Sequence, residues 1–156
     1  MNQEKEQALL SLLQTEWNSL TAALTTLQLS VDKCKSIGTK AEHSFEELES
    51  FDSLTSKFNR ASDIFTQKVL RTVWMLLHEP FVPFIDMMSK AEKISLLQSS
   101  DQMIEILDLR NQISHEYLPE AIHDLVPEVI LFTSQLAQNI ETCFGFLRSR
   151  HWINSN

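Results

Sequence analysis

The amino-acid sequence predicts an all-α fold, an antiparallel up-and-down four-helix bundle with one additional short helix. The chain has 156 residues, of which 43% are hydrophobic, so a single domain over residues 1–156 with one core is expected. It contains only two glycines and four prolines, so turns should be few and the elements between them long. Hydrophobic residues also recur every three or four positions, which is the helical period.

The first helix is predicted over residues 3–35. Its hydrophobic residues alternate three and four apart, as in a left-handed helical bundle; they are Leu10, Leu13, Trp17, Leu20, Leu24, Leu27 and Val31. Gly38 in "CKSIGTK" is a natural residue to end this helix. The spacing alone does not distinguish a stripe that fills the core from one that forms a dimer interface.

A second long helix is predicted over residues 45–78 and a short one over 84–97. One face of the long helix carries Leu48, Phe51, Leu54, Phe58, Ala61, Phe65, Val69 and Val73. Pro80 and Pro83 in "HEPFVPF" should end it, because proline cannot continue the hydrogen-bond ladder. The hydrophobic residues of the short helix are Phe84, Ile85, Met88 and Ile94.

The last two helices are predicted over residues 101–117 and 120–149. Ser99 and Gln102 have the spacing of a capping box at the first of these starts. Pro119 disfavours the α-conformation for Leu118 and should separate the two helices. The inward residues of the last helix are Val126, Val129, Phe132, Leu136, Ile140, Phe144 and Leu147.

The charge balance narrows the classes of partner. Thirteen basic residues against 21 acidic ones give a net charge of -8, which disfavours non-specific binding to duplex DNA or to an anionic membrane. A local basic site remains compatible with this balance. Cys34 and Cys143 lie far apart and predict free thiols in a reducing compartment. The polar start "MNQEKEQALL" is unlike a signal peptide, so the expectation is a cytoplasmic protein without membrane contact.

The candidate chemistry lies in "LRNQISHEYLPE". At about 100° per residue, Arg110, Ser114 and Tyr117 fall nearly on one line of the predicted helix, and Asn111 and His115 on the adjacent strip. Arginine offers a planar fork for phosphate, and histidine can give or take a proton near neutral pH. Such a pair suffices for RNA cleavage without a metal. The same spacing also fits a solvated helix edge.

The order Arg110, four residues, His115, one residue, Tyr117 matches the RxxxxHxY signature of the HEPN family. The chain resembles in particular the HepT-like toxins of HEPN–MNT toxin–antitoxin pairs. Asn111, directly after the arginine, is the commonest polar residue there, and "FNRASDIFTQKVLRTV" (58–73) resembles the second helix of such proteins. The motif is short, but the resemblance extends over most of the chain.

This resemblance implies a metal-independent endoribonuclease toxin without a cofactor, acting as a homodimer in which two motifs face one cleft. The ribose 2′-hydroxyl of RNA would attack the adjacent phosphate, with His115 as general acid or base, Arg110 as phosphate stabiliser and Asn111 as positioning residue. Tyr117, the only tyrosine of the chain, would accept AMP from an MNT-type nucleotidyltransferase antitoxin. The added bulk and negative charge would close the site.

A second function fits the same residues, namely a non-catalytic helical subunit that serves a nucleotidyltransferase in binding or substrate recognition. The acidic composition suits a protein partner better than free RNA. The two hypotheses share one fold and differ in chemistry, so activity of a His115 variant would separate them.

Two further sets of charged residues are candidates for the surroundings of the motif. Asp63 and Arg60 could face the motif from the second helix, although a charged pair at helical spacing is more typical of a solvated face. The same holds for Lys57, Lys68 and Arg71 as a local cationic rim. No metal site is predicted, because "HE" at positions 115–116 lacks the second histidine of a zinc-protease motif and the cysteines are not clustered.

Overall fold

The structure is a computed structural model that describes residues 1–154. All regular secondary structure in this range is helical, which confirms the prediction of an all-α fold. In chain order, the elements are α1 (Gln3–Ile37), α2 (Phe45–Asp63), the π-helix η1 (Ile64–Val69), α3 (Leu70–Leu76), α4 (Phe84–Lys93), α5 (Ser100–His115), α6 (Pro119–His123) and α7 (Val126–Ser149).

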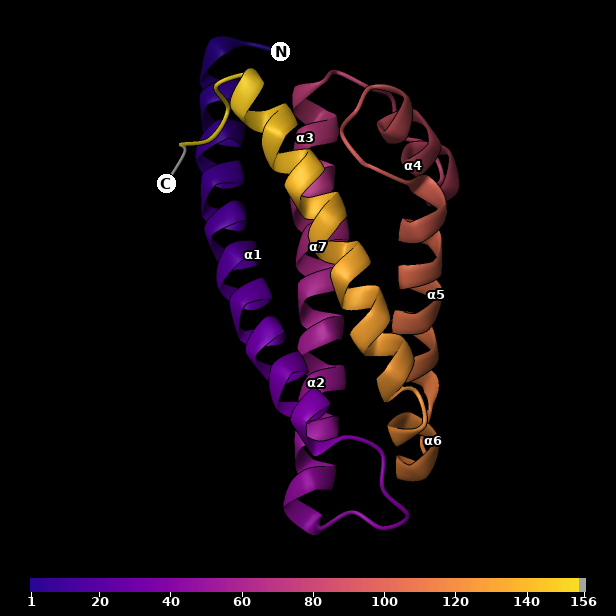
Figure 1. The fold of residues 1–156 in the computed structure, drawn as a ribbon. Helices are drawn as coiled ribbons and strands as arrows, with labels where there is room; N and C mark the ends of the chain where they lie inside the picture. The colour runs from indigo at the N-terminus through magenta and orange to yellow at the C-terminus, as the bar shows by residue number, and fades with distance from the viewer. Residues whose placement is uncertain (155–156) are drawn as a thin grey trace.

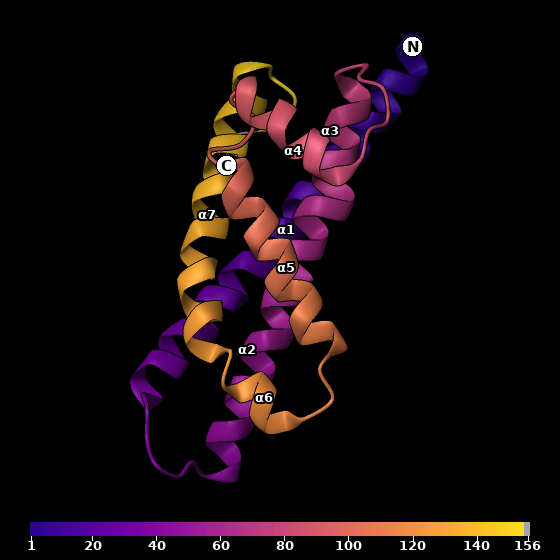
Figure 2. The same ribbon diagram turned by 90° about the vertical axis from the view of Figure 1, so that its right-hand side faces the viewer.

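The long helices lie side by side and alternate in direction along the chain (Figure 1). From the N-terminus, α1 runs the length of the molecule, α2, η1 and α3 return as one rod, α5 runs back and α7 returns. Contacts join α1 to α2 and α7, and α5 to α2, α4 and α7. The short helices α4 and α6 lie at opposite ends of the molecule (Figure 2).

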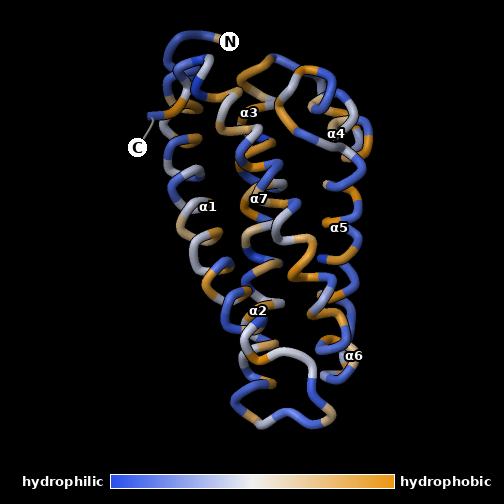
Figure 3. Tube along the Cα trace, viewed as in Figure 1, coloured by the Kyte–Doolittle hydropathy of each residue, from blue (hydrophilic) through white to orange (hydrophobic). Residues whose placement is uncertain are grey.

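The predicted stripe of the first helix belongs to the core of this chain. Leu13, Leu20 and Leu27 are fully buried, and Trp17 and Val31 nearly so. Burying one such side chain contributes about 1.5–3 kcal/mol. Figure 3 shows hydrophobic and hydrophilic residues alternating along each long helix, as expected for helices with one buried face.

The second helix differs from the prediction of one regular helix over residues 45–78. Residues 64–69 form the π-helix η1, and α3 ends at Leu76. The buried hydroxyls of Ser62 and Thr66 donate to the carbonyls of Phe58 and Ser62, both at 2.8 Å. Hydrogen bonds of this kind weaken and bend a helix locally. They lie at the junction of α2 and η1. His78, with a φ of 58°, takes the chain out of the helix just before the two prolines.

The short helix ends at Lys93 and not at residue 97. Ser95 adopts a φ of 64°, and this left-handed residue turns Leu96 and Leu97 into the core, where both are buried. Of the hydrophobic residues named for this helix, Met88 is buried, whereas Ile85 is 61% exposed and Ile94 is 42% exposed.

Three helices, α5, α6 and α7, stand in place of the last two predicted helices. α5 ends at His115 because Glu116 is extended, with a ψ of 131°; the prediction that Tyr117 continues the helical line of Arg110 is therefore wrong. α6 and α7 replace the single helix over 120–149. Pro127 lies in the first turn of α7, where its missing N–H removes no hydrogen bond. In a continuous helix it would have broken one.

Within residues 1–154, no helix combines the length and the apolar composition that crossing a bilayer demands.

Candidate functional site

A buried amide on α7 fixes the start of α5, the helix that carries the motif. Oδ1 of the fully buried Asn139 accepts the backbone N–H groups of Gln98 and Ser99, each at 3.0 Å. Its Nδ2 donates to Gln102 Oε1 at 3.0 Å and to the Gln135 carbonyl at 2.9 Å. Ser99 caps the helix by accepting the Gln102 N–H. The predicted capping box is therefore half present, since the Gln102 side chain bonds Asn139.

The buried stripe of α5 sets the direction of each motif residue. The stripe consists of Met103, Ile106, Leu109 and Ile113. With Ile106 as its centre, rotation by about 100° per residue places Arg110 at about 40°, Asn111 at about 140° and His115 at about 180°. Arg110 therefore leaves the helix on its core-facing side, where it is half-buried, whereas His115 faces away from the core.

Arg110 is held by a bidentate ion pair with Asp63, the last residue of α2. Arg110 Nε donates to Asp63 Oδ1 at 2.7 Å and Nη2 donates to Oδ2 at 2.8 Å. These hydrogen bonds raise the pKa of Arg110, against a smaller lowering by partial burial. Asp63 therefore faces the motif while its side chain stays 39% exposed, whereas Arg60, one turn earlier, is exposed. The pair fixes the plane of the guanidinium.

Part of the guanidinium remains open to a ligand. Arg110 Nη1 donates to Asn111 Oδ1 at 3.3 Å. An arginine carries about five N–H groups, and three of those on Arg110 have partners within residues 1–154. One N–H on Nη1 and one on Nη2 are left. The Arg110 side chain is 29% exposed, so it is partly accessible from solution.

A second contact between α2 and α5 lies one turn along. Asn59 Nδ2 donates to Ser114 Oγ at 3.2 Å. We call Asn59, Asp63, Arg110 and Ser114 the polar seam; two members lie four residues apart on each helix. The buried Asn59 Oδ1 has no hydrogen-bond partner among the described residues. The sequence interpretation missed Asn59, although its spacing of four from Asp63 at the edge of the stripe was a signal.

His115 is the last residue of α5 and is exposed. It lies about 7.5 Å along the axis from Arg110 and about 140° around it. No hydrogen bond or ion pair of its imidazole is found within the described part of the chain. The imidazole and the guanidinium of one chain therefore leave the helix in different directions.

Tyr117 lies beyond the helix, in the short loop between α5 and α6. This loop stands out at the side of the molecule in Figure 2, and Tyr117 is 92% exposed. Glu116 Oε1 accepts the N–H groups of Tyr117 at 3.0 Å and of Leu118 at 3.1 Å, which stabilises the bend. The phenol is thus presented to solvent two residues from His115.

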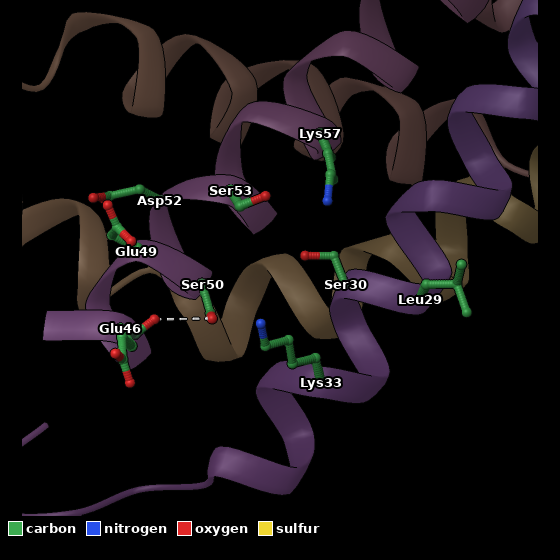
Figure 4. Close-up of a pocket in the computed structure, with 9 residues that line it drawn as sticks. All are labelled: Leu29, Ser30, Lys33, Glu46, Glu49, Ser50, Asp52, Ser53 and Lys57. Atoms are coloured by element: carbon green, nitrogen blue, oxygen red, sulfur yellow. Dashed lines mark hydrogen bonds between the residues drawn. The ribbon is translucent and has the colours of Figure 1, made fainter. Parts of the chain in front are cut away.

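A polar pocket of about 700 Å³ lies elsewhere, between α1 and α2. Figure 4 shows the amino groups of Lys33 and Lys57 pointing into it, with the carboxylates of Glu46, Glu49 and Asp52 gathered on one side. Three carboxylates against two amines give a lining that disfavours phosphate. Lys57 therefore belongs to this pocket and is not beside the motif.

The other two cations proposed for a rim, Lys68 on η1 and Arg71 on α3, are exposed. Arg71 lines a different pocket, between α3 and α4. Within residues 1–154, no group of three or more His, Cys, Asp or Glu side chains is placed to hold a metal ion.

Comparisons of the chain with protein-family models, with curated proteins and with solved structures give no match. A function for this site is therefore inferred from its residues and geometry alone.

Proposed function

We propose that this chain is a HEPN-type domain, an antiparallel up-and-down four-helix bundle, that acts in the cytoplasm as an endoribonuclease toxin. The observation that carries the proposal is the fixed orientation of the Arg110 guanidinium. Asp63 fixes its guanidinium plane through two hydrogen bonds of 2.7 and 2.8 Å, while two N–H groups stay open. An oriented, partly exposed arginine of this kind suits a phosphate oxygen.

The proposed reaction uses side chains alone. The 2′-oxygen of a ribose attacks the adjacent phosphorus and the bond from phosphorus to the 5′-oxygen breaks, leaving a 2′,3′-cyclic phosphate and a 5′-hydroxyl. The open N–H groups of Arg110 stabilise the charge that develops on the non-bridging oxygens. His115 takes the 2′-proton or gives a proton to the 5′-oxygen, and Asn111 positions Nη1 of the arginine.

The directions of these side chains support a homodimer. Arg110 and His115 of one chain leave α5 about 140° apart, so a phosphate on the open edge of Arg110 is better met by a histidine from elsewhere. We assign that histidine to a second copy of the chain, whose exposed His115 approaches across a two-fold axis. Each phosphate then contacts Arg110 of one subunit and His115 of the other.

The proposed partner is an MNT-type nucleotidyltransferase that transfers AMP to Tyr117. Transfer needs an accessible hydroxyl, and this side chain is 92% exposed in a loop that stands out from the bundle (Figure 2). An AMP group two residues from His115 adds a negative charge that repels an RNA phosphate.

RNA cleavage in a chelating buffer tests the nuclease. The purified protein is expected to cut RNA, and His115→Ala should lower the rate by a factor on the order of 10²–10⁴, because a proton donor or acceptor is lost. Gln112→Ala is the matched control, since Gln112 is exposed on the same helix. Equal rates for the wild type and His115→Ala would remove the assignment of His115.

Two observations favour the second function, a non-catalytic subunit that binds a nucleotidyltransferase or recognises its substrate. Asp63 compensates the charge of Arg110, and the net charge of -8 suits a protein partner better than a polyanion. In this case His115→Ala leaves complex formation intact, no ribonuclease activity is found, and expression of the protein does not arrest growth.

A further inference from the structure

A second pocket, of about 350 Å³, lies between α3 and α4. Buried or half-buried Trp74, Val82, Phe84 and Met87 line it together with the exposed Phe81. Pockets that bind small molecules have volumes of about 300–1,000 Å³ and a mostly apolar lining. Its size therefore fits one small ligand, whereas a helix, about 10–12 Å across, is too wide for it.

The walls of this pocket are fixed before any ligand arrives. Trp74 Nε1 donates to the carbonyl of Pro80 at 3.1 Å, which orients the indole and ties the loop to α3. Pro80 and Pro83 restrict the backbone on both sides of Phe81 and Val82. Binding would therefore require little ordering of the chain, which favours affinity.

The charged groups of the lining are one arginine and one glutamate. The Arg71 guanidinium lies over the Phe81 ring, 5.8 Å from its centroid. No ion pair of Arg71 or of Glu79 is found within residues 1–154. The pocket thus combines an apolar floor with a guanidinium that has its hydrogen-bonding fork available.

We propose that this pocket binds a small monocarboxylate with an apolar body. The body lies on Trp74, Phe84 and Met87, and the carboxylate takes a bidentate contact with Arg71, because the planar fork matches a carboxylate. Glu79 on the same lining disfavours a dianion such as a phosphate monoester. The π-helix η1 supplies Gln67 to the lining, and π-helical turns are frequent at functional sites.

Octanoate and 1-octanol are matched probes, because they share a chain and differ in charge. In an NMR titration of the ¹⁵N-labelled protein, octanoate should shift amides of α3, α4 and the loop between them. With about 10 non-hydrogen atoms, it is expected to bind with a Kd on the order of 0.3 mM. Octanol should bind about tenfold more weakly, since it loses the contact with the guanidinium.

Four variants make the test specific. Arg71→Gln should weaken octanoate about tenfold and leave octanol unchanged, and Glu79→Gln should strengthen octanoate by removing a like charge. Lys68→Gln is the control, since this exposed cation lies on η1 outside the lining. Val82→Trp, which fills the pocket, should abolish binding of both probes.

Three results would overturn the proposal. They are the absence of shifts with about 5 mM octanoate, equal affinities for octanoate and octanol, and equal losses in Arg71→Gln and Lys68→Gln. Each variant is checked for a wild-type pattern of distant amides, so that a folding defect is recognised.

Discussion

Replacing Asn139 by alanine tests how the start of α5, and with it the polar seam, is held in place. Asn139 is fully buried on α7 and makes four hydrogen bonds, two of them to backbone N–H groups ahead of α5. The variant removes all four bonds at once. Three of the four partners lie at the start of α5, and the fourth, the Gln135 carbonyl, is on α7 itself.

The expected loss follows from those bonds. A hydrogen bond contributes about 1 kcal/mol net, so four contribute about 4 kcal/mol. Water can reach some of the backbone N–H groups that lose their partner, because Gln98 is exposed and Ser99 is half-buried. We therefore expect Asn139→Ala to lower the free energy of unfolding by about 3 kcal/mol.

Urea unfolding followed by far-UV circular dichroism measures this loss. The midpoint should fall with an unchanged slope, which indicates a change in stability and not in the denatured state. Gln138→Ala, at an exposed position on the same helix, should stay within about 0.5 kcal/mol of the wild type. If Asn139→Ala did the same, the role given to this amide would be refuted.

Three further predictions concern the site and the buried thiols. Asp63→Asn should cost about 1 kcal/mol in urea unfolding, because the ion pair with Arg110 is partly exposed, and should slow RNA cleavage more than Gln112→Ala does; equal rates would contradict a positioning role. Tyr117→Phe should keep the cleavage rate, whereas Tyr117→Glu should lower it severalfold in the same assay by repelling phosphate; equal rates would remove the regulatory role of that position. Burial raises the pKa of Cys143 well above 9.0, so the folded state holds a proton that the unfolded state releases. Its contribution is therefore fully present below pH 9 and is lost as the pH rises further, by up to about 1.4 kcal/mol per pH unit. Unfolding free energies measured from pH 8 to 10 should fall less steeply for Cys143→Ala, and identical slopes would contradict the assigned burial.

The positions of the long helices could be predicted because each stripe is a local pattern. Leu13, Leu20 and Leu27 are spaced for one face and are all fully buried. The ends of helices were harder to place. Pro127 is a sequence signal for the start of α7, whereas nothing in the local pattern singles out Ser95 as the left-handed residue.

The π-helix η1 could not be predicted, because no residue pattern in "IFTQKV" specifies it. Its hydrophobic residues Phe65 and Val69 are buried, as the regular helical period also requires. Burial of these residues therefore does not distinguish a π-helix from an α-helix.

The spacing in the sequence singled out four candidate residues, namely Arg110, Asn111, His115 and Tyr117. It did not predict the directions of their side chains. The ion pair with Asp63 depends on the relative rotation of α2 and α5, which the whole core determines. Tyr117 is exposed because Glu116 leaves the helix two residues earlier than expected. The motif thus supplied candidate residues, and tertiary packing determined the direction of each side chain.

The central claim is that Arg110 of one subunit and His115 of another act on the same RNA phosphate, and complementation tests it most directly. Arg110→Ala and His115→Ala are each expected to be inactive alone. Mixed in equal amounts and allowed to exchange subunits, they should form heterodimers with one intact site and recover about a quarter of the wild-type cleavage rate. A mixture as inactive as its components, with heterodimers shown to be present, would contradict a site shared between two chains.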